Sequence, residues 1–203
     1  MMFKFRRIFL ALSFLLASSE LASGKDYTEI ADSGDRIETP AYSILPPREA
    51  GWMYLLENPI KIHFGKAGSK IGQSFTGLVS MSRMPAFETE EEFFDALSKQ
   101  RARDGNDPRF KDLVNDEKSA LVDGFLRFSF YKKYQDYGAN NLPGGSAYLV
   151  IEDYGVSFQH PYNPGVAVTV ALSQRAKPED LRDDFEALAK EFISSIEFRD
   201  FIE

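Results

Sequence analysis

The chain has 203 residues, 43% of them hydrophobic and 27% charged, which fits one ordinary globular domain plus a short extra segment. Eighteen Phe, nine Tyr and one Trp provide enough apolar surface to exclude disorder for most of the chain. Because there is no cysteine, disulfides, thiol chemistry and a lipid anchor on cysteine are also excluded.

The N-terminus has the pattern of a secretory signal peptide. Lys4, Arg6 and Arg7 precede an apolar stretch, residues 8–17, and small residues follow up to Gly24. The stretch is too short to span a bilayer, which takes about 20 residues. We expect cleavage after Gly24, with Ser19 as the other candidate and an uncleaved anchor or buried helix as the alternative. The expected location is therefore the periplasm or the exterior.

Cleavage would make the chain more acidic. Residues 1–24 hold three of the 24 basic and one of the 31 acidic residues, so the remainder has 21 basic and 30 acidic residues and a net charge of −9. Nucleic acids and anionic membranes require clustered positive charge, so neither is an expected partner.

The segment 25–50 contains Pro40, Pro46 and Pro47 and few adjacent apolar residues, which predicts an exposed arm or linker. The remaining residues, 51–203, are expected to form a single domain. Short strands are predicted at 52–56, 60–64 and 74–81. Their short connections favour antiparallel hairpins.

A helix is predicted next, with Thr89 and Glu92 as a capping box and Phe93 and Leu97 facing the core. A short turn after Pro108 should bury Phe110 and Leu113. Two hairpins should follow. The first turns at Asp123-Gly124, and the second joins 148–152 to 156–160 through a turn at residues 153–155.

The last strand is predicted at residues 166–172, and a final helix is predicted to begin at Pro178. Its apolar residues recur at helical spacing and are Leu181, Phe185, Leu188, Phe192 and Ile196. Two amphipathic helices need a sheet to cover. The expected fold class is α+β, an antiparallel sheet flanked by helices.

No catalytic or metal-binding motif is recognised, and no cofactor or metal is expected. His63 should point to solvent or a rim, and His160 should lie at the rim of a strand end. The chain has no G-x-S-x-G motif. The glycine-rich segment 65–70 lacks the Gly-Lys-Ser/Thr order of a phosphate loop and reads as a turn.

One surface feature suggests binding. Arg127, Tyr131 and Lys133 alternate along a strand, opposite Leu126, Phe128 and Phe130, and Tyr137 and Arg175 are predicted to lie nearby. Such a basic and aromatic stripe can contact a sugar or a partner protein. The alternative, which we consider the more common, is a sheet face covered by a helix. The candidate binding residues are Arg127, Tyr131, Lys133, His160 and Arg175.

The order of elements resembles a known family. The features that carry the resemblance are Gly51-Trp52, Phe64-Gly65-Lys66, His160-Pro161, Ser173-Gln174-Arg175 and Ile196-Glu197-Phe198. Across residues 51–198 the chain resembles a group of functionally uncharacterised exported bacterial proteins and, more widely, the PsbP-like fold. The resemblance implies an α/β/α sandwich with a non-catalytic accessory or binding role. It carries over no photosynthetic function and no functional residues.

Two functions are therefore compared. The first is an exported accessory or binding domain that acts through its surface on an envelope or secreted protein or a small ligand. The second is a hydrolase whose carboxylates are assembled by the fold. A cleft holding two or more carboxylates with raised pKa values would favour the hydrolase, whereas a shallow aromatic patch would favour the binding domain.

Overall fold

The structure is a computed structural model that describes residues 27–30, 34–104, 107–138 and 147–201. The predicted signal peptide and the loop from Asn140 to Gly145 lie outside the described residues. No described helix is long and apolar enough to cross a membrane.

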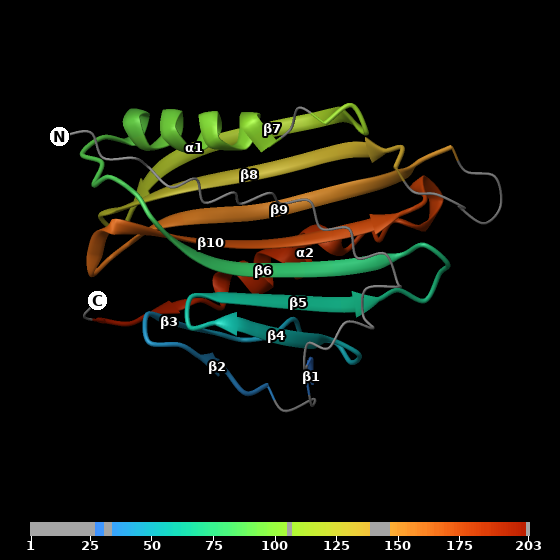
Figure 1. The fold of residues 1–203 in the computed structure, drawn as a ribbon, viewed down its shortest axis with the longest axis horizontal. Helices are drawn as coiled ribbons and strands as arrows, with labels where there is room; N and C mark the ends of the chain where they lie inside the picture. Colours follow the sequence, from blue (N-terminus) through green and yellow to red (C-terminus); the bar gives the residue numbers. More distant parts are fainter. Residues whose placement is uncertain (1–26, 31–33, 105–106, 139–146, 202–203) are drawn as a thin grey trace.

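Within the described ranges, eight antiparallel strands form one large sheet (Figure 1). In spatial order the strands are β1 (Thr28–Glu29), β4 (Met53–Asn58), β5 (Lys61–Ala67), β6 (Ser74–Arg83), β10 (Asn163–Ala176), β9 (Leu149–His160), β8 (Phe125–Asp136) and β7 (Phe110–Val122). A smaller sheet contains β11 (Glu197–Phe198), β3 (Tyr42–Ile44) and β2 (Ile37–Glu38).

The two helices pack on opposite faces of the large sheet. Helix α2 (Phe185–Ser194) contacts β9 and β10, and helix α1 (Glu90–Asp104) contacts β7 and β8. Successive side chains of a strand point to opposite faces. Accordingly Val170 of β10 belongs to the core under α2, and Ala171 belongs to the core under α1. The fold is thus α+β and dominated by its sheet.

The predicted start of α1 is confirmed. The Glu92 amide donates to Thr89 Oγ1 at 3.2 Å, and the Glu88 amide donates to Glu92 Oε2 at 3.4 Å. These two bonds satisfy amides that have no partner within the helix. Phe93 is fully buried, and Leu97 packs beside it in the core under α1.

The hairpin predicted over residues 148–160 is wrong, because β9 is one continuous strand. A Cβ atom on Gly155 would lie 2.1 Å from the Phe130 ring carbon Cζ. Gly155 is therefore in this strand because the Phe130 ring crosses it, not because the chain turns there. The Asp123-Gly124 turn is confirmed, with φ values of +53° and +82°.

Strand β7 begins nine residues earlier than the strand expected at Ser119. The buried position predicted for Leu113 is wrong, since its side chain is 46% exposed beside a bulge between Asp112 and Val114. The charged residues of this segment obscured its strand pattern. They are tolerated because β7 is an edge strand with one open side.

The last helix begins later than predicted. Pro178–Asp180 form a single 3₁₀ turn, Leu181 is extended, and α2 starts at Phe185. The expected apolar stripe is otherwise confirmed, because Phe185, Leu188 and Phe192 are buried against the sheet.

The prediction of an exposed arm at residues 25–50 is wrong for the segment around β3. Tyr42 and Ile44 are fully buried, and β3 pairs with β2 and β11. Ser195 joins the segment to α2, since its hydroxyl accepts from the Leu45 amide at 3.2 Å. Pro46 and Pro47 are also buried. Two of the three prolines that suggested a linker therefore pack against the domain, where they need no amide hydrogen bond, and Pro40 is exposed.

Candidate binding surface

Helix α2 covers only part of its face of the sheet. It contacts β9 and β10, whereas the α2 side of β8 and β7 lies beyond these contacts. Residues directly opposite in an antiparallel pair point to the same face. Asp116 is opposite Tyr131, and Lys118 is opposite Ser129. We call the surface formed by Arg127, Tyr131 and Lys133 of β8 with Asp116 and Lys118 of β7 the open strip.

Tyr131 lies at the centre of the open strip. Its ring stacks on Tyr154 of β9 with centroids 4.5 Å apart, and Tyr154 in turn contacts Phe185 of α2. The Tyr131 hydroxyl donates to Glu152 Oε1 at 3.2 Å. Burial, followed by the negative charge of Glu152, raises the pKa of Tyr131. The phenol therefore stays protonated at neutral pH, with its ring held in a fixed orientation.

Lys133 is anchored by the same carboxylate. Its Nζ lies 2.7 Å from Glu152 Oε1, and Gln174 Nε2 donates to Glu152 Oε2 at 2.6 Å. Gln174 is fully buried and also bonds both backbone groups of Arg182, just before α2. This network holds the charged end of the open strip in place.

Arg127 is at the other end of the open strip. Its guanidinium carbon lies 5.4 Å from the centre of the Phe158 ring, and its Nη2 is 3.6 Å from Asp123 Oδ2. Its Nε is buried and has no hydrogen-bond partner in the described residues. The predicted side of the strand is confirmed for all three β8 residues, because Leu126, Phe128 and Phe130 lie in the core under α1.

Arg175 was predicted near this stripe, but the structure places it on the opposite face. Arg175 Nη2 is 2.8 Å from Asp136 Oδ2, and Arg109 Nη2 is 2.7 Å from the same oxygen. Burial opposes ionisation of Asp136, yet the bonds from Arg109 and the Gly138 amide and the charge of Arg175 lower its pKa. Arg175 therefore neutralises a buried carboxylate and is no part of the open strip.

His160 was a further candidate and is 1% exposed. Its Nε2 is 3.1 Å from the Ala41 carbonyl oxygen, and its Nδ1 accepts from the Tyr162 amide at 3.3 Å. Burial lowers its pKa, so the ring is neutral with its proton on Nε2. The edge contacts with Phe198 and Phe201 complete its enclosure. His160 therefore fastens the segment before β3 and is not a surface binding residue.

His63 was expected to point to solvent or to a rim and is buried instead. Its Nε2 lies 2.8 Å from Glu57 Oε2, which also lies 3.0 Å from Lys61 Nζ. Hydrogen bonds from His63 and Lys61 lower the pKa of Glu57 to about 2. The described residues contain no group of three or more His, Cys, Asp or Glu side chains placed to hold a metal.

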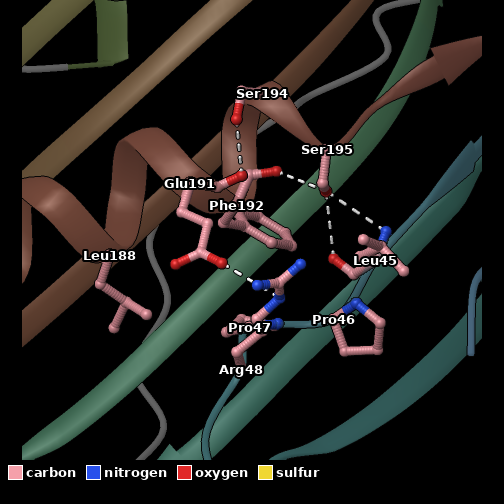
Figure 2. A pocket seen from close by; sticks show the side chains of 9 residues that line it. All are labelled: Leu45, Pro46, Pro47, Arg48, Leu188, Glu191, Phe192, Ser194 and Ser195. Atoms are coloured by element: carbon pink, nitrogen blue, oxygen red, sulfur yellow. Dashed lines mark hydrogen bonds and ion pairs between the residues drawn. The ribbon is translucent and has the colours of Figure 1, made fainter. Parts of the chain in front are cut away.

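Two hollows occur away from the open strip. One hollow, of about 160 Å³, lies between α2 and the segment that follows β3. Arg48 and Glu191 face each other at its rim (Figure 2), where Arg48 Nε lies 3.1 Å from Glu191 Oε1. The other, of about 330 Å³, lies among the turn between β4 and β5, the end of β6 and the start of β10, and includes Phe201. Neither contains a residue predicted to bind, and no sequence pattern indicated either hollow.

The hydrolase alternative was expected to show two or more carboxylates with raised pKa values in a cleft, and Asp153 is the one described carboxyl group whose resolved shift is upward. Burial raises the pKa of Asp153, which accepts hydrogen bonds from Tyr134 and Ser173. The pKa values of Glu49, Glu57, Asp136, Asp184 and Glu186 are lowered instead. Asp153 lines neither hollow. No second acid with a raised pKa accompanies it among the described carboxyl groups whose shifts are resolved.

Comparison with solved structures finds proteins of similar fold. The chain is similar in fold to the solution structure of cyanobacterial PsbP (CyanoP) from Synechocystis sp. PCC 6803, with 14% sequence identity and a TM-score of 0.43. The alignment covers 86% of this chain and 92% of that one. No family model and no curated protein sequence matches the chain.

Proposed function

We propose that this chain is an exported accessory or binding protein that contacts a partner protein through the open strip. The observation that carries the proposal is the position of α2, which contacts β9 and β10 and leaves the neighbouring side chains of β8 and β7 accessible. Export to the periplasm or the exterior rests on the signal-peptide pattern of residues 1–24.

The chemistry of the open strip favours a partner with acidic and polar side chains. Tyr131 is an aromatic anchor whose ring is already oriented by Tyr154, so little conformational entropy is lost on binding. Arg127 and Lys133 carry positive charge on a protein whose overall charge is −7. Aromatic and arginine side chains are enriched among the residues that dominate protein interfaces.

Site-specific photo-crosslinking tests the proposal, because it captures a partner of any identity. The photoreactive residue p-benzoylphenylalanine replaces Tyr131 in the native host and keeps an aromatic ring at the site. The matched control carries the same residue at Ile71, which is 70% exposed on the turn between β5 and β6. We expect a discrete adduct with another protein from position 131 only. That adduct should weaken as salt screens Arg127 and Lys133.

Equal labelling from both positions, or no adduct from position 131, would rule out the open strip as the contact surface. An adduct that carries only a second copy of this chain would also contradict a separate partner protein.

A further inference from the structure

The outer edge of β7 is the most extended unpaired backbone in the described structure. β7 has 13 residues and pairs only with β8, and no described strand lies on its other side (Figure 1). An edge strand of this length presents a row of free amide and carbonyl groups that another strand can pair with. The side chains along it are largely exposed, including Leu121 at 62% and Val114 at 40%.

We infer that β7 pairs with β7 of a second copy of this chain, antiparallel and about a two-fold axis at Glu117. Such an axis is perpendicular to the sheet, so each face of one copy continues as the same face of the other. Asp116 then faces Lys118 of the second copy, and Lys118 faces its Asp116. The inference goes beyond the proposed function and does not depend on it.

Charge selects this register. Asp116 and Lys118 are exposed, and neither forms an ion pair within the described residues. An axis at residue 116 would place Asp116 against its own copy, and an axis at residue 118 would do the same for Lys118. Opposite charges facing each other across a strand pair stabilise it, and like charges destabilise it. Within the regular ladder beyond the bulge, residues 114–122, only the axis at Glu117 pairs opposite charges twice.

Glu117 itself would face its own copy, but its charge is already compensated. Its carboxylate accepts from Ser98 at 2.7 Å and from Arg101 at 3.3 Å, both on α1. The same register places exposed Val114 opposite Ala120, and both of these side chains point to the α2 side. The ladder would run from Val114 to Ala120, because the bulge at Leu113 interrupts it.

Pairing would also enlarge the open strip. Both copies present this surface on the same side of the sheet, so the two open strips would lie next to each other across β7 and its copy. The combined surface would span four strands, β8 and β7 of each copy. Helix α2 of each copy would lie beyond its outer side. A partner with two equivalent segments could then bind both copies together.

A charge-swap series measured by sedimentation equilibrium tests the inference on the purified exported chain. We expect a mass of two chains that falls to one on dilution. Asp116→Lys and Lys118→Asp should each weaken the dimer by about tenfold or more, because each change makes two facing pairs repulsive. The double variant Asp116→Lys/Lys118→Asp should restore it. Circular dichroism should show unchanged folding, because both side chains are exposed.

Disulfide trapping tests the register separately. The chain contains no cysteine, so Val114→Cys/Ala120→Cys introduces the only thiols. Six residues apart on one strand, they are too distant to join within a chain, but they would face each other between copies. We expect rapid cross-linking to a dimer with the double variant and slow cross-linking with either single variant. A single-chain mass at every concentration, indifference to both charge reversals, or equal cross-linking in all three variants would each overturn the inference.

Discussion

Ile44 provides the most direct stability test of the docked N-terminal segment. Its side chain is fully buried in the core under α2, together with Tyr42. Replacing a buried Ile by Ala removes packed carbon atoms and leaves a cavity, which costs about 2–5 kcal/mol. For a chain of this size each kcal/mol lowers Tm by about 2–4 °C, so Ile44→Ala should lower Tm by roughly 5–15 °C.

The assay is thermal unfolding of the purified chain followed by circular dichroism. Ile71→Ala is the matched control, because it removes the same atoms from a side chain that is 70% exposed. We expect the Tm of this control to change by less than about 2 °C, as is usual for an exposed site. If Ile44→Ala also unfolds within about 2 °C of the unchanged chain, the segment is not docked and the reasoning is refuted.

Three further predictions concern the sheet. Gly155→Ala should cost about 1–3 kcal/mol because its methyl group meets the Phe130 ring, and urea unfolding should show a smaller cost in a Phe130→Leu background. Burial raises the pKa of Asp153, so this group contributes stability below its unfolded pKa that is lost as pH rises through its folded value. The free energy of unfolding of Asp153→Asn, measured in urea relative to that of the unchanged chain, should therefore rise from pH 4 to pH 8. A relative free energy that stays flat or falls would contradict the raised pKa of Asp153. Tyr131→Ala should lower the free energy of unfolding by about 1 kcal/mol through loss of the stack on Tyr154, whereas Tyr131→Phe, which keeps the stack, should cost less.

The alternation of apolar side chains predicted much of the fold. Leu126, Phe128 and Phe130 share the face under α1, as expected from their spacing of two. The Thr89–Glu92 capping box and the Asp123-Gly124 turn were recognisable because their chemistry is local. Such features depend on neighbouring residues in sequence, so one chain is enough to predict them.

The errors arose where distant residues decide the structure. Gly155 reads as a turn unless the Phe130 ring that crosses it is known. Residues 36–47 read as a linker because their partners, β11 and α2, come about 150 residues later. Arg175 was misplaced because its partner, Asp136, lies on another strand, β8.

The candidate surface could be predicted only in part. The spacing of Arg127, Tyr131 and Lys133 placed them on one face, but it could not show where α2 would lie over that face. We considered a covering helix the more common case, and the structure leaves these side chains half-exposed. The anchors of Lys133, half-buried Glu152 and fully buried Gln174, gave no sequence signal of their role, since the register of three strands brings them to Lys133.

The central claim is that the open strip binds a partner protein, and one comparison tests it most directly. The photo-crosslinked adduct from position 131 is quantified in Arg127→Ala/Lys133→Ala and in the control Arg48→Ala/Lys99→Ala, which removes one Arg and one Lys from exposed sites elsewhere. The open strip predicts that the first variant loses at least about tenfold in adduct yield while the control keeps its yield, with both variants folded. Equal yields in the two variants would contradict the claim.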